Sequence, residues 1–336
     1  MGRESISWSR LRVPVVMLAS GIHCTQNETW GIQNPAAQRP GENRRSFGQP
    51  MRHDEPSEDA LERAAWAIRS AQAILIGAGA GMGVDSGLPD FRGGSGFWKA
   101  YPPYARLGLD FVSLANPRWF ASDPELAWGF YGHRLMLYRE TEPHEGFGIL
   151  RRWMSRMCGR GFVYTSNVDG HFQKAGFSPD QVYEVHGSIG AMQCLSECGV
   201  NIFSADPYSL NIDYQTMRAI PPLPKCPRCG AMARPNILMF GDWGWDSSHA
   251  EAQQQQLKSW LVSLAGVPLV VVECGAGTAI PTVRLACQDI ARRYDATLIR
   301  INPREPEVPE DQISLSMRAY DALRALDERI GSWTPQ

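Results

Sequence analysis

The stretch from Ala73 to Trp98, AILIGAGAGMGVDSGLPDFRGGSGFW, constrains the fold of this chain more than any other. An apolar run over 73–76 breaks into Gly77-Ala78-Gly79-Ala80-Gly81, which is typical of a strand that ends in a glycine-rich turn. Glycines let backbone N–H groups approach a pyrophosphate, because no Cβ stands in the way. The turn therefore indicates a nucleotide site, with a purely structural bend as an equal alternative.

The spacing of these glycines argues against the common dinucleotide fingerprint. Counting G-x-G-x-x-G from Gly77 puts Met82 at the third glycine, and counting from Gly79 puts Val84 there. A simple Rossmann dehydrogenase is therefore disfavoured. The turn runs on into Pro89-Asp90-Phe91-Arg92-Gly93, so an acid, an aromatic ring and a guanidinium are expected beside the phosphate site.

Helical and strand-like segments alternate along most of the chain. The sequence predicts helices from Ser57 and over 123–140, 247–264, 282–294 and 315–330, and strands over 73–76, 161–165, 182–185, 268–273 and 297–302. This alternation predicts an α/β fold with a doubly wound parallel, Rossmann-like sheet. We expect the Rossmann-like domain to comprise 57–189 and 236–331, a small inserted module to comprise 190–235, and 1–56 to be a disordered extension.

Length and charge narrow the class of protein. The chain has 336 residues and a formal net charge of −2, so its overall charge does not favour a nucleic acid or an anionic membrane as partner. No apolar run reaches the roughly 18 to 20 residues that a membrane helix needs. Cysteines that fit a metal site better than disulfides favour a reducing, cytoplasmic location. The oligomeric state is left open by the sequence.

Four of the eight cysteines form two close pairs inside the expected insert. They are Cys194, Cys198, Cys226 and Cys229, with three and two intervening residues in the pairs. Two thiolates on each of two tight turns complete a tetrahedral four-sulfur site, which has no open position for catalysis. The sequence therefore predicts one structural Zn²⁺ per chain, with free thiols or two disulfides as the alternative.

Polar clusters follow two of the predicted strands. Thr165-Ser166-Asn167-Val168-Asp169-Gly170-His171 could line a ribose or amide site, although composition alone favours a simple turn. Glu184-Val185-His186-Gly187-Ser188 puts a histidine directly after a strand. A histidine there can act as a general base, but a lone histidine is more often a structural residue.

Taken together, these motifs resemble the sirtuins, the NAD-dependent protein deacylases. The glycine turn with its PDFR tail, the SNVDG segment, the His-Gly-Ser, the two cysteine pairs and the Gly275-Ala276-Gly277 turn occur in the order found in that family. The resemblance spans roughly 60–326. Each motif is weak alone, and the five in order are specific.

The resemblance implies a role for each matching residue. His186 matches the catalytic base that acts on a ribose hydroxyl of NAD, and Asn167 and Asp169 match the pair at the nicotinamide and ribose site. The implied cofactor-binding positions are Gly77, Ala78, Gly79, Asp90, Phe91, Arg92, Ser166, Asn167, Asp169, Gly275, Ala276, Gly277 and Asn302. The implied zinc ligands are Cys194, Cys198, Cys226 and Cys229. Phe240-Gly241-Asp242 matches the stretch that pairs with an acyl-lysine peptide as an added strand.

The implied activity is removal of an acyl group from a protein lysine, with NAD cleaved to nicotinamide and the acyl group transferred to ADP-ribose. Departures from the family pattern keep other functions open. Ser166 replaces a usual Gln, Gly81 replaces a common Ser, and Asp242-Trp243-Gly244-Trp245-Asp246 brings two indoles beside the expected peptide groove. The alternatives are an NAD glycohydrolase or protein ADP-ribosyltransferase on the same scaffold, and a non-catalytic NAD-sensing module.

Overall fold

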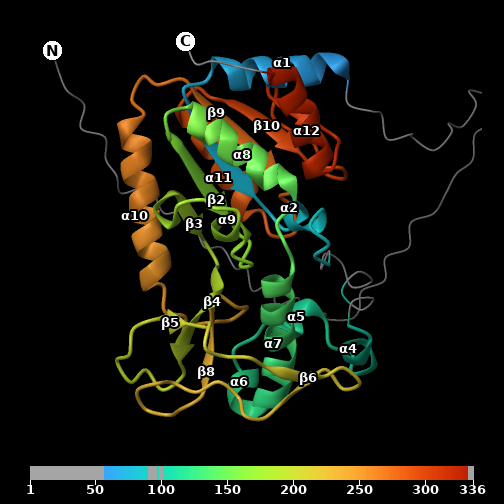
Figure 1. Ribbon diagram of the computed structural model, residues 1–336, viewed down its shortest axis with the longest axis vertical. Coiled ribbons are helices and arrows are strands. Elements are labelled where there is room, and N and C mark those ends of the chain that lie inside the picture. The colour runs from blue at the N-terminus through green and yellow to red at the C-terminus, as the bar shows by residue number, and fades with distance from the viewer. Residues whose placement is uncertain (1–56, 90–96, 98–100, 332–336) are drawn as a thin grey trace, which may run out of the picture.

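The structure is a computed structural model that describes residues 57–89, 97 and 101–331 (Figure 1). The expected extension over 1–56 and the expected cofactor contacts Asp90, Phe91 and Arg92 lie outside the described residues. The described chain begins with α1 (Glu58–Ser70), as predicted from Ser57. The Ser57 hydroxyl accepts a hydrogen bond from Ala60 N at 3.2 Å, which satisfies a backbone donor that the first helical turn leaves open.

A six-stranded sheet forms the large lobe, and every pair of neighbouring strands in it is parallel. Its order is β11-β10-β9-β1-β2-β3. The strands are β1 (Ala73–Ala78), β2 (Gly161–Thr165), β3 (Val182–Glu184), β9 (Leu269–Cys274), β10 (Thr297–Ile301) and β11 (Ile313–Leu315). The last residues of β1, β2 and β9 lie in register, so these strands end at one edge. The predicted doubly wound parallel sheet is confirmed.

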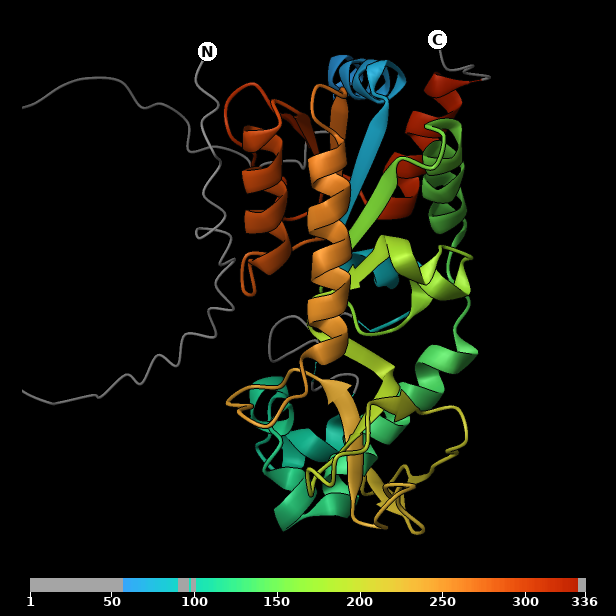
Figure 2. The ribbon, with the colours of Figure 1, turned by 90° about the vertical axis from the view of Figure 1, so that its left-hand side faces the viewer.

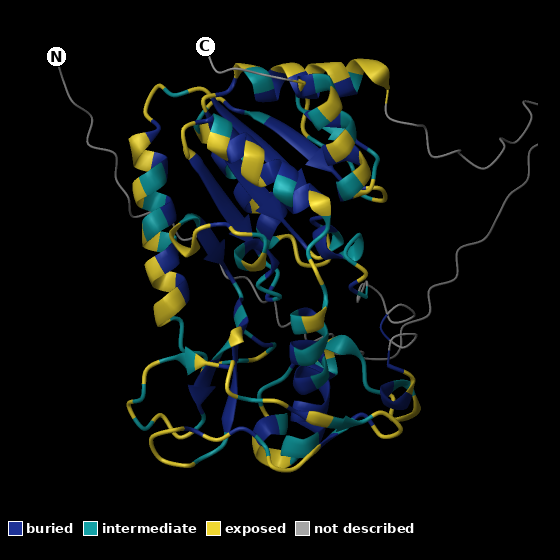
Figure 3. Cartoon of the chain, in the orientation of Figure 1, coloured by how far each residue is buried: buried dark blue, intermediate teal, exposed yellow. Residues whose placement is uncertain are grey.

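Helices cover both faces of this sheet (Figure 2). Successive residues of a strand point to opposite faces, so each apolar strand contributes side chains to both helical layers. Ile74 and Ile76 pack with α1, α8 (Glu145–Arg156) and α12 (Ala319–Ile330). Ala73 and Leu75 pack with α10 (Ser248–Ser263) and α11 (Thr282–Arg293). Figure 3 shows the strands buried between helices that expose only their outer faces.

The small lobe contains more of the chain than the sequence predicted. Its three-stranded antiparallel sheet consists of β4 (Gly187–Cys194), β5 (Phe203–Ser204) and β8 (Ala233–Ile237), next to the hairpin of β6 (Asn211–Asp213) and β7 (Arg218–Ile220). Four helices pack on these strands: α4 (Pro102–Arg106), α5 (Phe111–Leu114), α6 (Trp119–Ser122) and α7 (Pro124–Glu140). The expected division at 190–235 therefore differs from the packing, because 101–140 shares its apolar cluster with this lobe.

Two local predictions were wrong for identifiable reasons. The segment 315–318 is not helical, because Leu315 is buried and pairs with Ile301 as part of an edge strand. Helix α8 was not predicted at all, since Gly146 and Gly148 weaken the helical signal of its first turns. Among the described helices, none combines the length and apolar character needed to cross a membrane.

Candidate functional site

Two glycine turns meet backbone to backbone at the carboxyl ends of β1 and β9. Gly79 N donates to Cys274 O and Gly81 N donates to Gly275 O, both at 3.0 Å. A Cβ on Gly79 would lie 2.6 Å from Ala276 Cα, so no larger residue fits there without a backbone shift. In open parallel sheets, ligands bind in the crevice outside the carboxyl ends of the strands. The two turns therefore form the floor of a candidate nucleotide site.

The positions before the first turn belong to the sheet itself. Gly77 and Ala78 are the last residues of β1, and a Cβ on Gly77 would contact Val283 Cγ1 of α11 at 3.2 Å. The Ala78 carbonyl accepts hydrogen bonds from Ser166 N at 3.2 Å and Thr165 Oγ1 at 2.9 Å. These residues hold the turns in place. The short helix α2 (Gly81–Val84) then continues from the first turn.

Asn167 is fixed beside this turn by two groups, the Gly79 carbonyl and the Thr165 hydroxyl. Its amide Nδ2 donates to Gly79 O at 3.0 Å, and its backbone N donates to Thr165 Oγ1 at 3.0 Å. Sequence reasoning included Thr165 in the polar segment but gave it no role, whereas its hydroxyl links β1 to the Asn167 backbone. Asn167 is half-buried beside the turn.

Asp169 lies beside the other wall of the same crevice. Its Oδ1 accepts His171 N at 2.9 Å, and its Oδ2 is 3.7 Å from the point where a Cβ on Gly83 would stand. The half-buried carboxyl group therefore faces α2, which follows the glycine turn. His171 itself is buried among aromatic rings, including Tyr138 and Phe147, and fits the structural role expected for it.

His186 follows β3 and lies next to the polar segment. Val185 N donates to Thr165 O at 2.9 Å and Ile189 N donates to Val168 O at 2.9 Å, so 165–168 and 185–189 run side by side. Part of the His186 side chain is accessible, but burial of its ring lowers its pKa to about 4, opposed by the Ser166 backbone. The ring is therefore uncharged at neutral pH and able to accept a proton.

Glu184, two residues before His186, is a buried titratable group that sequence reasoning did not single out. Burial raises its pKa to about 7, and hydrogen bonding from Ser188 opposes the shift. A carboxyl group buried on a strand gives no signal in the sequence, because Val182 to Val185 reads as an ordinary strand.

Asn302 fixes the second glycine turn from the far side. Its Nδ2 donates to Ala276 O at 2.8 Å, while its Oδ1 accepts the backbone N of Arg304 and of Glu305, each at 3.0 Å. Asn302 is 1% exposed, and Gly277 is half-buried at the start of an exposed loop. The structure thus brings Asn302 and 275–277 together, at the opposite end of the crevice from β3.

The four cysteines converge as predicted. The Sγ atoms of Cys194, Cys198, Cys226 and Cys229 all lie within 4.8 Å of one another, with the two shortest separations at 3.6 Å. Four sulfurs that each bind a tetrahedral Zn²⁺ at about 2.3 Å have separations between sulfurs that fit this spacing. Gly199 and Gly230 follow the pairs with φ of +75° and +74°, a conformation that favours glycine. Within the described residues no other group of this kind occurs, and the set fits a structural zinc.

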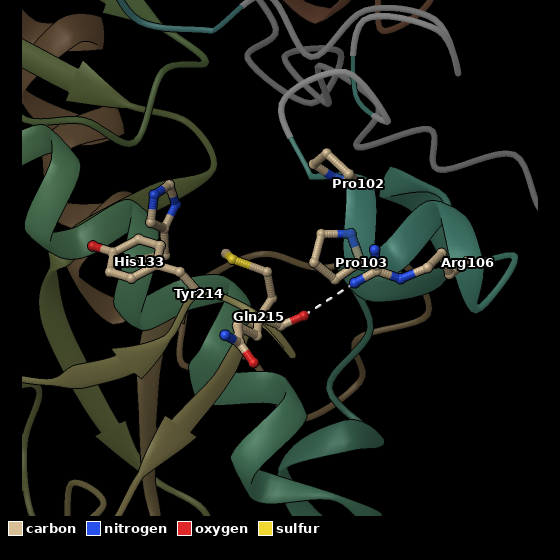
Figure 4. A pocket seen from close by; sticks show the side chains of 7 residues that line it. Pro102, Pro103, Arg106, His133, Tyr214 and Gln215 are labelled. Carbon is tan, nitrogen blue, oxygen red and sulfur yellow. Dashed lines mark hydrogen bonds between the residues drawn. The ribbon is translucent and has the colours of Figure 1, made fainter.

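A surface cavity of about 410 Å³ lies in the small lobe, between α4 and the hairpin of β6 and β7 (Figure 4). Pro103, Arg106, His133 and Tyr214 are among its lining residues, and Arg106 Nη2 donates to Gln215 O at 3.0 Å. None of the expected site residues lines it. The cavity is therefore separate from the crevice at the strand ends.

The arrangement brings together a place for a pyrophosphate, an amide, a carboxyl group and a neutral histidine. Such a set can hold a dinucleotide along the edge formed by β10, β9, β1 and β2, with a base at its β3 end. The four-sulfur group lies beyond β4 in the small lobe and leaves no coordination position open for substrate.

Comparisons with known proteins agree with this geometry. The model of the Sir2 family matches residues 79–272. NAD-dependent protein deacylase 1 of Archaeoglobus fulgidus is 30% identical over 267 residues, which cover 78% of this chain and 95% of the relative. NAD-dependent protein deacylase 1 of Pseudomonas aeruginosa is 30% identical over 70% of this chain and 85% of its own length.

Solved structures give the same result. A Sir2 homologue variant in complex with ADP-ribose is 27% identical, has a TM-score of 0.59, and matches 80% of this chain and 96% of that protein. A Sir2 homologue in complex with NAD is 25% identical, with a TM-score of 0.59 and coverage of 83% and 98%.

Proposed function

The chain belongs to the Sir2 family, and from that premise we propose that it is an NAD-dependent protein lysine deacylase with His186 as its general base. The reaction cleaves NAD to nicotinamide and transfers the acyl group of an acyl-lysine side chain to ADP-ribose. NAD is a substrate that is consumed and not a hydride carrier. The observation that carries the proposal is the alignment of two backbone-packed glycine turns, Asn167 and His186 along one sheet edge.

Each residue has a defined task in this proposal. The turns at Gly79 and Gly275 receive the pyrophosphate, because they follow the carboxyl ends of β1 and β9, where open parallel sheets bind their ligands. Asn302 holds the second turn for the adenosine half, while Asn167 and Asp169 line the nicotinamide and its ribose. Asp90, Phe91 and Arg92 lie outside the described residues and remain proposed contacts of the cofactor. Ser166 and Gly277 lie within the described residues and are proposed contacts as well.

The chemistry follows from where charge develops. The acyl carbonyl oxygen of the substrate bonds to the anomeric carbon of the ribose as the bond to nicotinamide breaks. Positive charge on the ribose is stabilised by the carboxyl and amide dipoles of Asp169 and Asn167. His186, neutral at pH 7 because burial lowers its pKa to about 4, then accepts the proton of the 2′-hydroxyl as that oxygen attacks the bound acyl carbon. The lysine nitrogen takes up a proton and leaves the acyl carbon. Water then adds to that carbon and the bond to the anomeric oxygen breaks, which yields free lysine and O-acyl-ADP-ribose.

The remaining parts of the chain support this reaction without taking part in it. One Zn²⁺ held by Cys194, Cys198, Cys226 and Cys229 stabilises the small lobe. The substrate is an acyl-lysine protein or peptide that docks at the edge formed by 238–246. Thiolates kept for a metal fit a reducing compartment, so we propose a cytoplasmic location.

The test measures nicotinamide release from NAD with and without an acetyl-lysine peptide. Wild type is compared with His186→Ala and with the matched control His249→Ala, which removes an exposed histidine from α10. We expect peptide-dependent release in wild type and in the control, and a loss of at least about a hundredfold in His186→Ala, the usual contribution of a general base.

Three other outcomes contradict the proposal. Release that needs no peptide favours an NAD glycohydrolase or an ADP-ribosyltransferase. NAD binding with no release under any condition favours a sensing module. Full activity of His186→Ala excludes this histidine as the base.

A further inference from the structure

The segment from Leu238 to Asp246, termed here the bridging segment, joins the two lobes. It begins where β8 ends in the small lobe and leads to α10 on the large lobe, as Figures 1 and 2 both show. Leu238 N donates to His186 O at 2.9 Å, and Phe240 N donates to Ala115 O at 2.8 Å. The segment therefore contacts the backbone of His186 directly.

A buried ion pair fixes the first half of the bridging segment. Arg234 and Asp242 have side chains only 1% and 0% exposed, and the two pair directly. Asp242 Oδ2 also accepts Met239 N at 3.2 Å, while Arg234 Nη2 donates to Ile237 O at 3.2 Å. Because a buried charge that loses its partner is costly, this pair holds the turn in one conformation.

Gln193 of β4 fixes the second half. Its Nε2 donates to Gly244 O at 2.6 Å, and its Oε1 accepts Asp246 N at 3.2 Å and Asn236 Nδ2 at 3.0 Å. The two residues that flank Trp243, Asp242 and Gly244, are thus both held by the small lobe.

Trp243 stands out on this rigid base, because its side chain is 99% exposed. Single exposed apolar residues are normal on protein surfaces, but this indole stands between two residues that the small lobe holds in place, in a segment whose first residue donates to the backbone of His186. Its neighbour Trp245 is half-buried against the large-lobe cluster of α10 and α11. The two indoles therefore differ in role: Trp245 packs, whereas Trp243 has its surface free for a partner.

The charge around Trp243 selects the kind of partner. Residues 238–251 include Asp242, Asp246 and Glu251 but no lysine or arginine. Arg234 neutralises Asp242. Among the described residues, Asp246 and Glu251 accept hydrogen bonds from neutral donors only, namely Ser248 N and the Ser247 hydroxyl. An exposed indole attracts a cation over its face, and Trp is the best of the aromatic residues for this contact.

We propose that Trp243 is a specificity-determining residue that receives an arginine or lysine side chain flanking the acyl-lysine of the substrate. The inference rests on the proposed function, in which the peptide docks at the bridging segment, whose Leu238 N donates to the backbone of His186. Asp246 and Glu251 add attraction for the same positive charge. The substrates of this chain are then basic stretches of protein around the modified lysine.

The experiment compares two acetyl-lysine peptides that differ only in arginine against citrulline at the positions flanking the lysine. Citrulline has nearly the shape of arginine without its charge. We expect wild type to favour the arginine peptide in kcat/KM by about two- to fivefold, the range of an exposed cation–π contact. Trp243→Ala should lose this preference through a higher peptide KM, while the KM for NAD stays unchanged.

The control variant is Trp66→Ala, which removes a tryptophan that is 64% exposed on α1 of the large lobe. Its preference should equal that of wild type, and Trp243→Phe should keep part of it. A wild type that does not distinguish the peptides, or a Trp243→Ala variant that still does, overturns the inference.

A binding measurement separates this inference from the proposed function. Fluorescence anisotropy of the labelled arginine and citrulline peptides needs no turnover. Preferential binding that depends on Trp243 supports the inference even where nicotinamide release fails. Normal release with equal binding of both peptides overturns the inference alone.

Discussion

The two lobes achieve their folds by different means. The large lobe stacks helices on both faces of a parallel sheet whose strands β1, β2 and β9 are entirely buried. The small lobe has a three-stranded antiparallel sheet, a separate hairpin and an aromatic cluster around Phe130 and Trp128. At one end of that lobe four cysteines converge where short strands offer little apolar surface.

This difference explains how the site is divided between them. A buried parallel sheet places loops at its carboxyl edge with little freedom, which suits the binding of a dinucleotide. The small lobe supplies the bridging segment, which contacts the backbone of His186 and is the proposed docking edge for the peptide. The comparison predicts that a substitution in the metal site destabilises the small lobe alone. A substitution in the parallel sheet or its glycine turns should instead weaken NAD binding or lower the free energy of unfolding of the whole protein.

The largest expected effect is that of Cys226→Ser. Bound zinc should fall from about one per chain to near zero, because three thiolates hold the ion much less tightly than four. Hydrogen exchange should then show loss of protection in β4, β5 and β8 with little change in β1 and β9. Peptide-dependent activity should be lost as well.

Cys158→Ser is the matched control, because Cys158 is exposed and lies outside the four-sulfur group. It should keep zinc, protection and activity. Wild-type protein that contains no zinc and is fully stable contradicts the structural role of the metal.

A core truncation tests the large lobe. Ile76→Ala removes a side chain that is 0% exposed at the centre of β1, and it should lower the free energy of unfolding by about 2–5 kcal/mol. Urea denaturation followed by circular dichroism measures this, and zinc content should not change. Val262→Ala, at a position that is 53% exposed on α10, should stay within about 0.5 kcal/mol of wild type. Equal effects of the two variants would refute the packing argument.

A smaller effect is expected where the glycine turns meet. In Gly79→Ala the new Cβ lies 2.6 Å from Ala276 Cα and 2.7 Å from Gly275 O, so two backbones must move apart. The cost of about 1–3 kcal/mol should appear as a KM for NAD raised at least about fivefold. Gly148→Ala, where the nearest atom is Arg152 Nη1 at 3.7 Å, should leave that KM unchanged. An unchanged KM for NAD in Gly79→Ala contradicts the proposal that the two glycine turns form the floor of the nucleotide site.

The two lobes also differ in how much of their structure the sequence could predict. The apolar run over 268–273 predicts the buried parallel strand β9, and the cysteine spacing predicts the metal site, because both patterns are local. The membership of 101–140 in the small lobe was not predictable, since it depends on contacts such as Gly129 against Met217, far apart in the chain. The edge strand β11 was missed because three residues are too few to show a period.

Within the site, the residue types were predictable and their supports were not. Asn167 and His186 could be found from motifs, whereas the hydroxyl of Thr165 that orients Asn167 shows its role only in the folded chain. The ion pair of Arg234 and Asp242 is likewise invisible in sequence, although the two residues are close along the chain. Sequence motifs identify the candidate site residues, and tertiary contacts show which residues hold them in place.

The most direct test of the account is the ratio of nicotinamide released to lysine deacylated. It is measured in one reaction by chromatography of NAD products and mass spectrometry of an acetyl-lysine peptide. The account predicts one nicotinamide for every lysine freed, with both products absent in His186→Ala. Nicotinamide in clear excess over freed lysine, or release that continues without peptide, contradicts it.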